Sequence, residues 1–181
     1  TITAGTKVEY APVSLSQESI TIYGYMDSVL HKLTGARGNV SFDFSVDGIP
    51  VMKFDFTGIF NQVTDAVLAA QTLTAWQKPL PVNRANTPTF TLHGFATIIE
   101  KLSIDIANSV VFRSLVGGVE QVLITNRKPA GSLSMEATTV AAKDWWTAIK
   151  NATTGALQLI HGFNPGNIFQ IDISALKLNE N

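Results

Sequence analysis

Residues 39–57 give the strongest indication of the fold and read Asn-Val-Ser-Phe-Asp-Phe-Ser-Val-Asp-Gly-Ile-Pro-Val-Met-Lys-Phe-Asp-Phe-Thr. Polar and apolar residues alternate on both sides of a turn that begins at Asp47-Gly48, a dipeptide that favours tight turns. Alternation with a period of two indicates a strand with one buried and one solvated face. The stretch therefore predicts an antiparallel hairpin with an apolar face (Val40, Phe42, Phe44, Val46, Met52, Phe54 and Phe56) and a polar face (Asn39, Ser41, Asp43, Ser45, Lys53, Asp55 and Thr57).

Much of the remaining chain alternates in the same way, in short runs that are separated by Gly and Pro residues. Regularly spaced short strands of this kind are typical of a β-sandwich or a β-barrel. We therefore expect a mainly β fold, an antiparallel sandwich or barrel with one flanking α-helix. Besides the hairpin, strands are expected at residues 19–25, 89–95, 102–107, 119–125, 132–137, 157–160 and 168–176.

The expected helix lies at residues 140–152, where apolar residues recur at helical spacing. Thr139 is a suitable N-cap, and Gly155 lies just beyond the end. A helix of about three turns would pack on the sheet through Trp145 and Ile149.

Residues 61–88 break the alternating pattern and contain Pro79, Pro81 and Pro88. Residues 65–71 suit a short helix, whereas residues 77–88 read as extended loop. A long loop inside a compact domain is usually functional or disordered. Nothing in the composition marks a domain boundary, so we expect residues 1–181 to form a single domain.

The composition limits the partners of the chain. Of the 181 residues 15% are charged, against about 25% in an average protein, and the net charge of -1 gives no general attraction to nucleic acid or anionic lipid. No apolar run approaches the roughly 18 residues of a membrane span, so membrane insertion is not expected. A polar surface with few charges is found on proteins that assemble with other subunits, and also on adhesins. The polar face of the hairpin suits a solvated surface, and it equally suits the wall of a water-filled channel.

The sequence offers little for catalysis. There is no cysteine, and the three histidines lie at no metal-binding spacing, so neither a metal nor a cofactor is expected. Asp43 and Asp55 could face each other across the hairpin as the paired carboxylates of a hydrolase. However, both fall on the solvated face beside Lys53, and no nucleophile motif or phosphate loop is present. We therefore expect no enzyme.

The order of the turn and strand motifs resembles that of the tail tube, or major tail, proteins of long-tailed bacteriophages. Residues 1–14 and 33–44 fit the family pattern in the first half of the chain. In the second half, residues 121–137 and 155–173 carry its turns. The matching turn residues are Arg127, Pro129 and Gly131, and then Gly162, Gly166 and Asn167.

The resemblance implies a structural virion protein. Tail tube subunits form hexameric rings that stack into a hollow tube, which is the channel for genome delivery. The partners would be other copies of the chain and other tail proteins, and DNA would pass without specific binding. The subunit would lie in the host cytoplasm before assembly and in the phage tail afterwards. Because family members are often longer, this chain is expected to be a piece of a larger subunit.

The resemblance also implies roles for individual residues. The polar hairpin residues Asn39, Ser41, Asp43, Ser45, Lys53 and Asp55 would line the lumen. The loop at residues 61–88 would reach a neighbouring subunit or the next ring through Trp76, Leu80 and Arg84. The helix would lie outside and pack through Trp145 and Ile149.

Two alternatives from other classes stay open at this point. A β-sandwich binding or adhesion module of a phage tail would share the composition, although it would carry exposed aromatic residues at its loop tips, where only Trp76 qualifies. The tube of a related contractile injection or type VI secretion system would share the fold.

Overall fold

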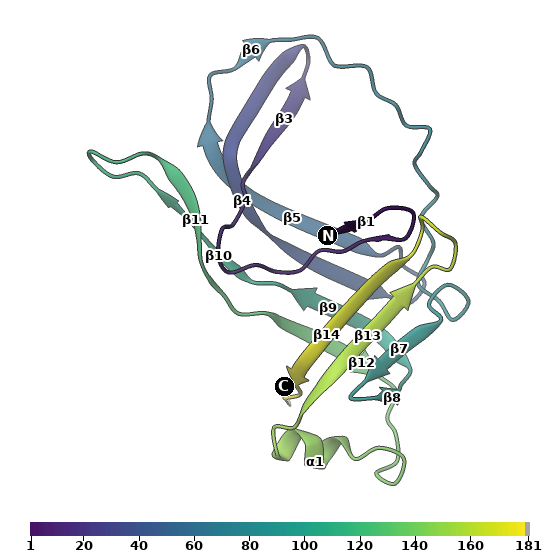
Figure 1. The fold of residues 1–181 in the computed structure, drawn as a ribbon. Coiled ribbons are helices and arrows are strands. Elements are labelled where there is room, and N and C mark those ends of the chain that lie inside the picture. The colour runs from purple at the N-terminus through teal and green to yellow at the C-terminus, as the bar shows by residue number, and fades with distance from the viewer. Residues whose placement is uncertain (180–181) are drawn as a thin grey trace. The chain divides into compact units, whose positions relative to one another are not determined.

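The computed structural model describes residues 1–179, which fall into two compact units. Unit 1 contains Thr1–Asn39, Asp55–Ala69 and Asn108–Arg127, and unit 2 contains Val40–Phe54, Ala70–Ala107 and the chain from Lys128 onward. Two long strands, β4 (Val29–Ser45) and β5 (Val51–Phe60), contribute residues to both units (Figure 1).

Unit 2 is a β-sandwich of two antiparallel sheets. One sheet places β9 (Ile99–Asp105) between β12 (Ala130–Met135) and the C-terminal part of β4, and β5 also pairs with β4. The other sheet has the order β14-β13-β7-β8 (Figure 1). Its strands are β14 (Phe169–Lys177), β13 (Thr154–His161), β7 (Thr89–Leu92) and β8 (Phe95–Ala96).

The core of unit 2 lies between the two sheets. Phe44 from the first sheet and Leu92 and Leu159 from the second are almost completely buried. The ring of Phe169 bridges the sheets, because its centroid lies 5.8 Å from that of Phe42 and 5.8 Å from that of Phe44. The expectation of a mainly β sandwich with one helix is thus confirmed, and the described strands form no closed barrel.

Helix α1 (Trp145–Lys150) is shorter than the sequence pattern predicts. The cap is Asp144, whose carboxylate accepts a hydrogen bond of 2.8 Å from the backbone N–H of Thr147. The predicted cap, Thr139, lies instead in a preceding turn, where its carbonyl accepts from the N–H groups of Ala142 and Lys143. A turn closed by Thr139 directs the chain away from a helical path, so residues 140–144 stay outside the helix.

Unit 1 consists of strands and turns. The N-terminal part of β4 pairs with β3 (Ile20–Met26) and with β6 (Thr64–Asp65). A second hairpin joins β10 (Asn108–Arg113) to β11 (Gln121–Arg127), and β1 (Ile2–Thr3) with β2 (Lys7–Val8) forms a small ribbon. The prediction of a short helix at residues 65–71 is wrong, because residues 66–71 contain no helix. Strand β10 was not predicted.

Two arginines hold the N-terminal segment of unit 1 against the β10–β11 hairpin. The guanidinium of Arg37 donates to the carbonyl groups of Val122 and Gln17. The guanidinium of Arg127 donates to the Asn108 side chain at 3.0 Å and to the carbonyl of Val13 at 2.6 Å. The N-terminal segment accepts these bonds through backbone carbonyl groups, so the contact depends on its backbone conformation more than on its side chains.

Candidate functional site

Three strands of unit 2 join their polar residues into one continuous face. In the register of the sheet, Ser103 of β9 lies opposite both Asp43 of β4 and Ser132 of β12. Lys101, two residues before Ser103 on β9 and so on the same face, lies opposite both Ser45 and Ser134. We name this surface the polar face. Its members are Ser41, Asp43, Ser45, Lys101, Ser103, Asp105, Ser132 and Ser134.

The alternation of the strands sets the direction of the polar face. The neighbouring residues Phe44, Leu102 and Ile104 are buried in the sandwich core, and successive side chains of a strand point to opposite sides. The polar face therefore points away from the core of unit 2. Such a face stays hydrated and offers no apolar pocket to a ligand.

The charges on the polar face are mixed and weakly coupled. The ammonium group of Lys101 lies 3.9 Å from a carboxylate oxygen of Asp43, and both side chains are half exposed. Exposed ion pairs of this kind contribute little, typically about 0–1 kcal/mol. With Asp43 and Asp105 against Lys101, the face has more negative than positive groups, so it does not attract a polyanion.

The six lumen candidates are distributed over both units. Ser41, Asp43 and Ser45 lie on the polar face, and Lys53 lies on exposed β5 in the same unit. The other two, Asn39 and Asp55, belong to unit 1, where the Asn39 side chain accepts a hydrogen bond of 2.9 Å from the N–H of Asn108. The members of the polar face from β9 and β12 are not among the predicted lumen residues. Their alternation was visible, but their pairing with β4 joins distant parts of the chain.

Strand β5 is exposed on both faces in the single chain. Every residue from 51 to 57 is exposed, and the side chain of Phe54 is 52% exposed. The expectation that Met52, Phe54 and Phe56 belong to the core is therefore wrong for the single chain, as it is for Val46. The alternating pattern correctly predicted a strand with an apolar face, and much of that face remains exposed in the described chain.

Two strands lie at the edges of this sheet. In the described strand pairing, β5 pairs with β4 and β12 pairs with β9. An unpaired edge presents a row of N–H and C=O groups that can bind another strand. The sheet therefore offers two edges for pairing, and one of them carries exposed phenylalanines.

The loop candidates differ in how tightly they are held. Trp76 is 80% exposed, and Arg84 is also exposed. Leu80 is half buried, and its carbonyl lies 3.1 Å from Nε2 of His161. Nδ1 of the same buried ring lies 3.0 Å from the hydroxyl of Thr87, so His161 donates through Nε2 and accepts through Nδ1. Residues 80–87 are thus fixed to unit 2, and the exposed Trp76 precedes them.

The helix candidates lie beside an unusual histidine. Trp145 is buried in the core of unit 2 and Ile149 is half buried. The ammonium group of Lys143 donates to the carbonyl of His93 at 2.9 Å and lies 5.4 Å from the centre of the Trp145 ring. Burial, and then the nearby Lys143 charge, lower the pKa of His93 below its ordinary value of 6.5.

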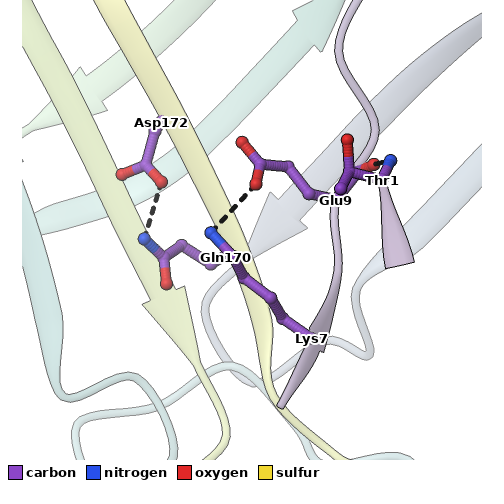
Figure 2. Close-up of polar contacts among 5 residues, drawn as sticks. All are labelled: Thr1, Lys7, Glu9, Gln170 and Asp172. Carbon is purple, nitrogen blue, oxygen red and sulfur yellow. Dashed lines mark hydrogen bonds and ion pairs between the residues drawn. The ribbon is translucent and has the colours of Figure 1, made fainter. Parts of the chain in front are cut away.

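The outer face of the second sheet carries a small polar network. The carboxylate of Asp172 accepts a hydrogen bond of 2.6 Å from the side-chain amide of Gln170 (Figure 2). It also accepts one of 2.8 Å from the side-chain amide of Gln158. In unit 1, Lys7 pairs with Glu9 at 2.9 Å, also drawn in Figure 2. These contacts are exposed on the surface of each unit, and they bring no catalytic group into a pocket.

Across residues 1–179, no three His, Asp or Glu side chains gather where they could bind a metal ion. The one described helix is also far too short to cross a membrane.

Comparison with known proteins gives one match. The family model described as phage tail tube protein matches residues 1–180, which include both compact units. No curated protein and no solved structure matches the chain.

Proposed function

The chain belongs to the phage tail tube protein family, and from this premise we propose that it forms hexameric rings that stack into a hollow tube for genome delivery. Membership makes it a structural component of the virion, which assembles with itself and with other tail components. Before assembly, the proposed subunit resides in the host cytoplasm.

The observation that carries the ring proposal is the state of β5. It lies at the edge of its sheet, and its apolar residues Met52, Phe54 and Phe56 are 51%, 52% and 41% exposed. Burying apolar surface contributes about 25 cal/mol per Å², and pairing the edge satisfies its backbone groups. In the proposed ring, β5 of one subunit pairs with β12 of the next, so each subunit uses both free edges and the sheets close into one barrel.

The polar face would then form the inner wall of the tube. Asp43, Lys101 and Asp105 keep that wall hydrated and slightly negative. A wall of this kind lets DNA pass, because a protein retains DNA mainly through Lys and Arg contacts to the phosphates. We propose the same position in the inner wall for three further predicted lining residues, Lys53 and Asp55 on β5 and Asn39 on β4.

The loop at residues 61–88 would bind a neighbouring subunit. Trp76 supports this role best, because a large exposed aromatic side chain is a common anchor of protein interfaces. Leu80 and Arg84 lie in the part of the loop that His161 fixes to unit 2, so they would present a surface of constant shape.

Native mass spectrometry with negative-stain electron microscopy tests the proposal on the full chain and on the Phe54→Asp variant. We expect hexamers and hollow tubes from the unchanged chain. We expect folded monomers from Phe54→Asp, since a charge cannot be buried without a partner. The matched control is Val140→Asp, which also places a carboxylate at an exposed apolar position of unit 2 and should leave assembly intact. Monomers of the unchanged chain at high concentration would count against the ring and favour a binding module.

A further inference from the structure

One segment of the long loop contacts both sheets of unit 2. We name residues 80–87 the strap. Its two ends are held at the second sheet, where Nε2 of His161 on β13 lies 3.1 Å from the carbonyl of Leu80 and Nδ1 lies 3.0 Å from the hydroxyl of Thr87. Between these ends, the side chain of Val82 is 4% exposed and belongs to the core of unit 2. The strap is therefore an integral part of the fold, whereas residues 71–79 before it are exposed.

The backbone of Val82 is bonded to the turn between β4 and β5. The N–H of Val82 donates to the carbonyl of Gly48 at 2.7 Å, and the N–H of Asp47 donates to the carbonyl of Val82 at 2.8 Å. One buried residue thus bonds through both of its backbone groups to two adjacent residues of the turn. The turn therefore depends on the strap for two of its hydrogen bonds.

The turn held in this way has an unfavourable backbone conformation. The N–H of Gly48 donates to the carbonyl of Ser45 at 3.0 Å, so the turn spans residues 45–48, and Asp47 at its third position has a φ of 63°. A turn with a positive φ at its third position favours glycine there, because a side chain is strained in this conformation. The glycine is the next residue, Gly48. A turn centred one residue later would place Gly48 in the left-handed conformation instead and relieve Asp47.

We propose that Val82 is a positioning residue for the edge strand β5. Its two backbone hydrogen bonds hold the turn on Asp47, against the preference of the sequence for a turn on Gly48. Because the turn of a hairpin sets the register of the two strands, Val82 determines which residues of β5 lie opposite β4. The consequence for assembly rests on the proposed function: only β5 in this register presents the edge that pairs with β12 of the next subunit.

Two variants separate the backbone bonds of Val82 from its burial. Val82→Pro removes the N–H that donates to Gly48 and keeps a buried apolar side chain. Val82→Ala keeps both backbone bonds and removes buried methyl groups. NMR on the single chain measures the hydrogen exchange of the Asp47 N–H and the contacts between α-protons of β4 and β5, which report the register. We expect Val82→Pro to exchange at least tenfold faster at Asp47 and to show a new set of cross-strand contacts, and Val82→Ala to keep the original set.

A second substitution tests whether strain at Asp47 is the cause. Asp47→Gly relieves the positive φ, so the observed turn no longer needs the strap. The double variant with Val82→Pro and Asp47→Gly should therefore recover the original cross-strand contacts. The matched control is Asp27→Gly combined with Val82→Pro. It relieves a φ of 48° in the turn between β3 and β4, and it should not restore the register of β5.

His161→Ala provides a second way to release the turn, because it frees both ends of the strap and leaves Val82 unchanged. It should populate the same new contacts as Val82→Pro, and Asp47→Gly should suppress them. An original register in both Val82→Pro and His161→Ala would overturn the inference. Failure of Asp47→Gly to restore the register would overturn it as well.

Native mass spectrometry of the same variants separates this inference from the proposed function. Val82→Pro should form no hexamers, and the double variant with Asp47→Gly should form them again. Hexamers of Val82→Pro with a changed register would overturn the link between Val82 and assembly. If the unchanged chain forms no hexamers while the register responds as expected, the proposed function fails and the role of Val82 in the turn stands.

Discussion

At the scale of the residue, the two phenylalanines of one hairpin give the clearest contrast. Phe44 is 2% exposed and belongs to the core of unit 2, whereas Phe54 is exposed. Replacing Phe44 by Ala should lower the free energy of unfolding by about 3–5 kcal/mol, because it removes buried surface and leaves a cavity. Phe54→Ala should cost far less in the unassembled chain. Urea unfolding of the two variants measures the difference, and equal losses would contradict the placement of Phe44.

His93 predicts how unit 2 responds to pH. Its pKa is lowered in the folded protein by burial and by Lys143, so the unfolded chain binds a proton first as the pH falls below 6.5. The free energy of unfolding should therefore decrease from pH 6.5 down to the folded pKa and lose no more below it. His93→Asn should remove this dependence, since Asn also tolerates the φ of 49° at this position. Urea unfolding above and below pH 6.5 provides the test, with His31→Asn as the exposed control. A slope that persists in His93→Asn would assign it to another group.

At the scale of the element, the sequence predicted strands well and their partners poorly. The alternation of residues 39–57 correctly indicated two strands, because side chains alternate in any strand. It could not distinguish Phe44, which is buried, from Phe54, which is half exposed. Apolar character shows that a face needs a partner, and not which molecule supplies it.

The same limit explains what was missed in the candidate site. Lys101, Ser103, Ser132 and Ser134 join the polar face only because β9 pairs with both β4 and β12. These pairings connect residues far apart in the sequence, and no local pattern encodes them. The predicted helix includes Trp145, as observed, but its first residue was predicted too early. The start of the helix depends on whether Thr139 acts as an N-cap or forms a separate turn, and short polar residues favour both.

The loop that carries Arg84 is an element whose anchoring can be measured. His161 holds Leu80 and Thr87, which lie on either side of Arg84. Losing these buried hydrogen bonds should cost about 1–3 kcal/mol and open the loop more often. Trypsin should therefore cut after Arg84 about tenfold faster in His161→Ala, and by an intermediate amount in Thr87→Val. The control His31→Ala should behave like the unchanged chain, and equal rates in all variants would show that His161 does not anchor the loop.

At the scale of the whole molecule, the proposed lumen can be tested through its charge. In the variant with both Asp43→Lys and Asp55→Lys, two candidate lining residues change from negative to positive. Tubes should still assemble, but genome ejection should slow because the wall then binds phosphates, and added salt should restore the rate. The matched control is Asp172→Lys, which makes the same change on the outer face of the other sheet of unit 2. Ejection at the normal rate in the double variant would remove Asp43 and Asp55 from the lumen.

The proposed pairing of β5 with β12 of the next subunit has a kinetic consequence for the ring. Each subunit that joins an incomplete ring forms one β5–β12 interface and loses its translational and rotational freedom. The step that closes the ring forms a further interface without that loss, and so incomplete rings are the least stable species. Assembly of free subunits is then limited by nucleation, so they remain unassembled until a nucleus is supplied. The site and moment of tube growth would therefore be decided by whatever first presents a ready-made ring template, and not by the amount of subunit in the cell.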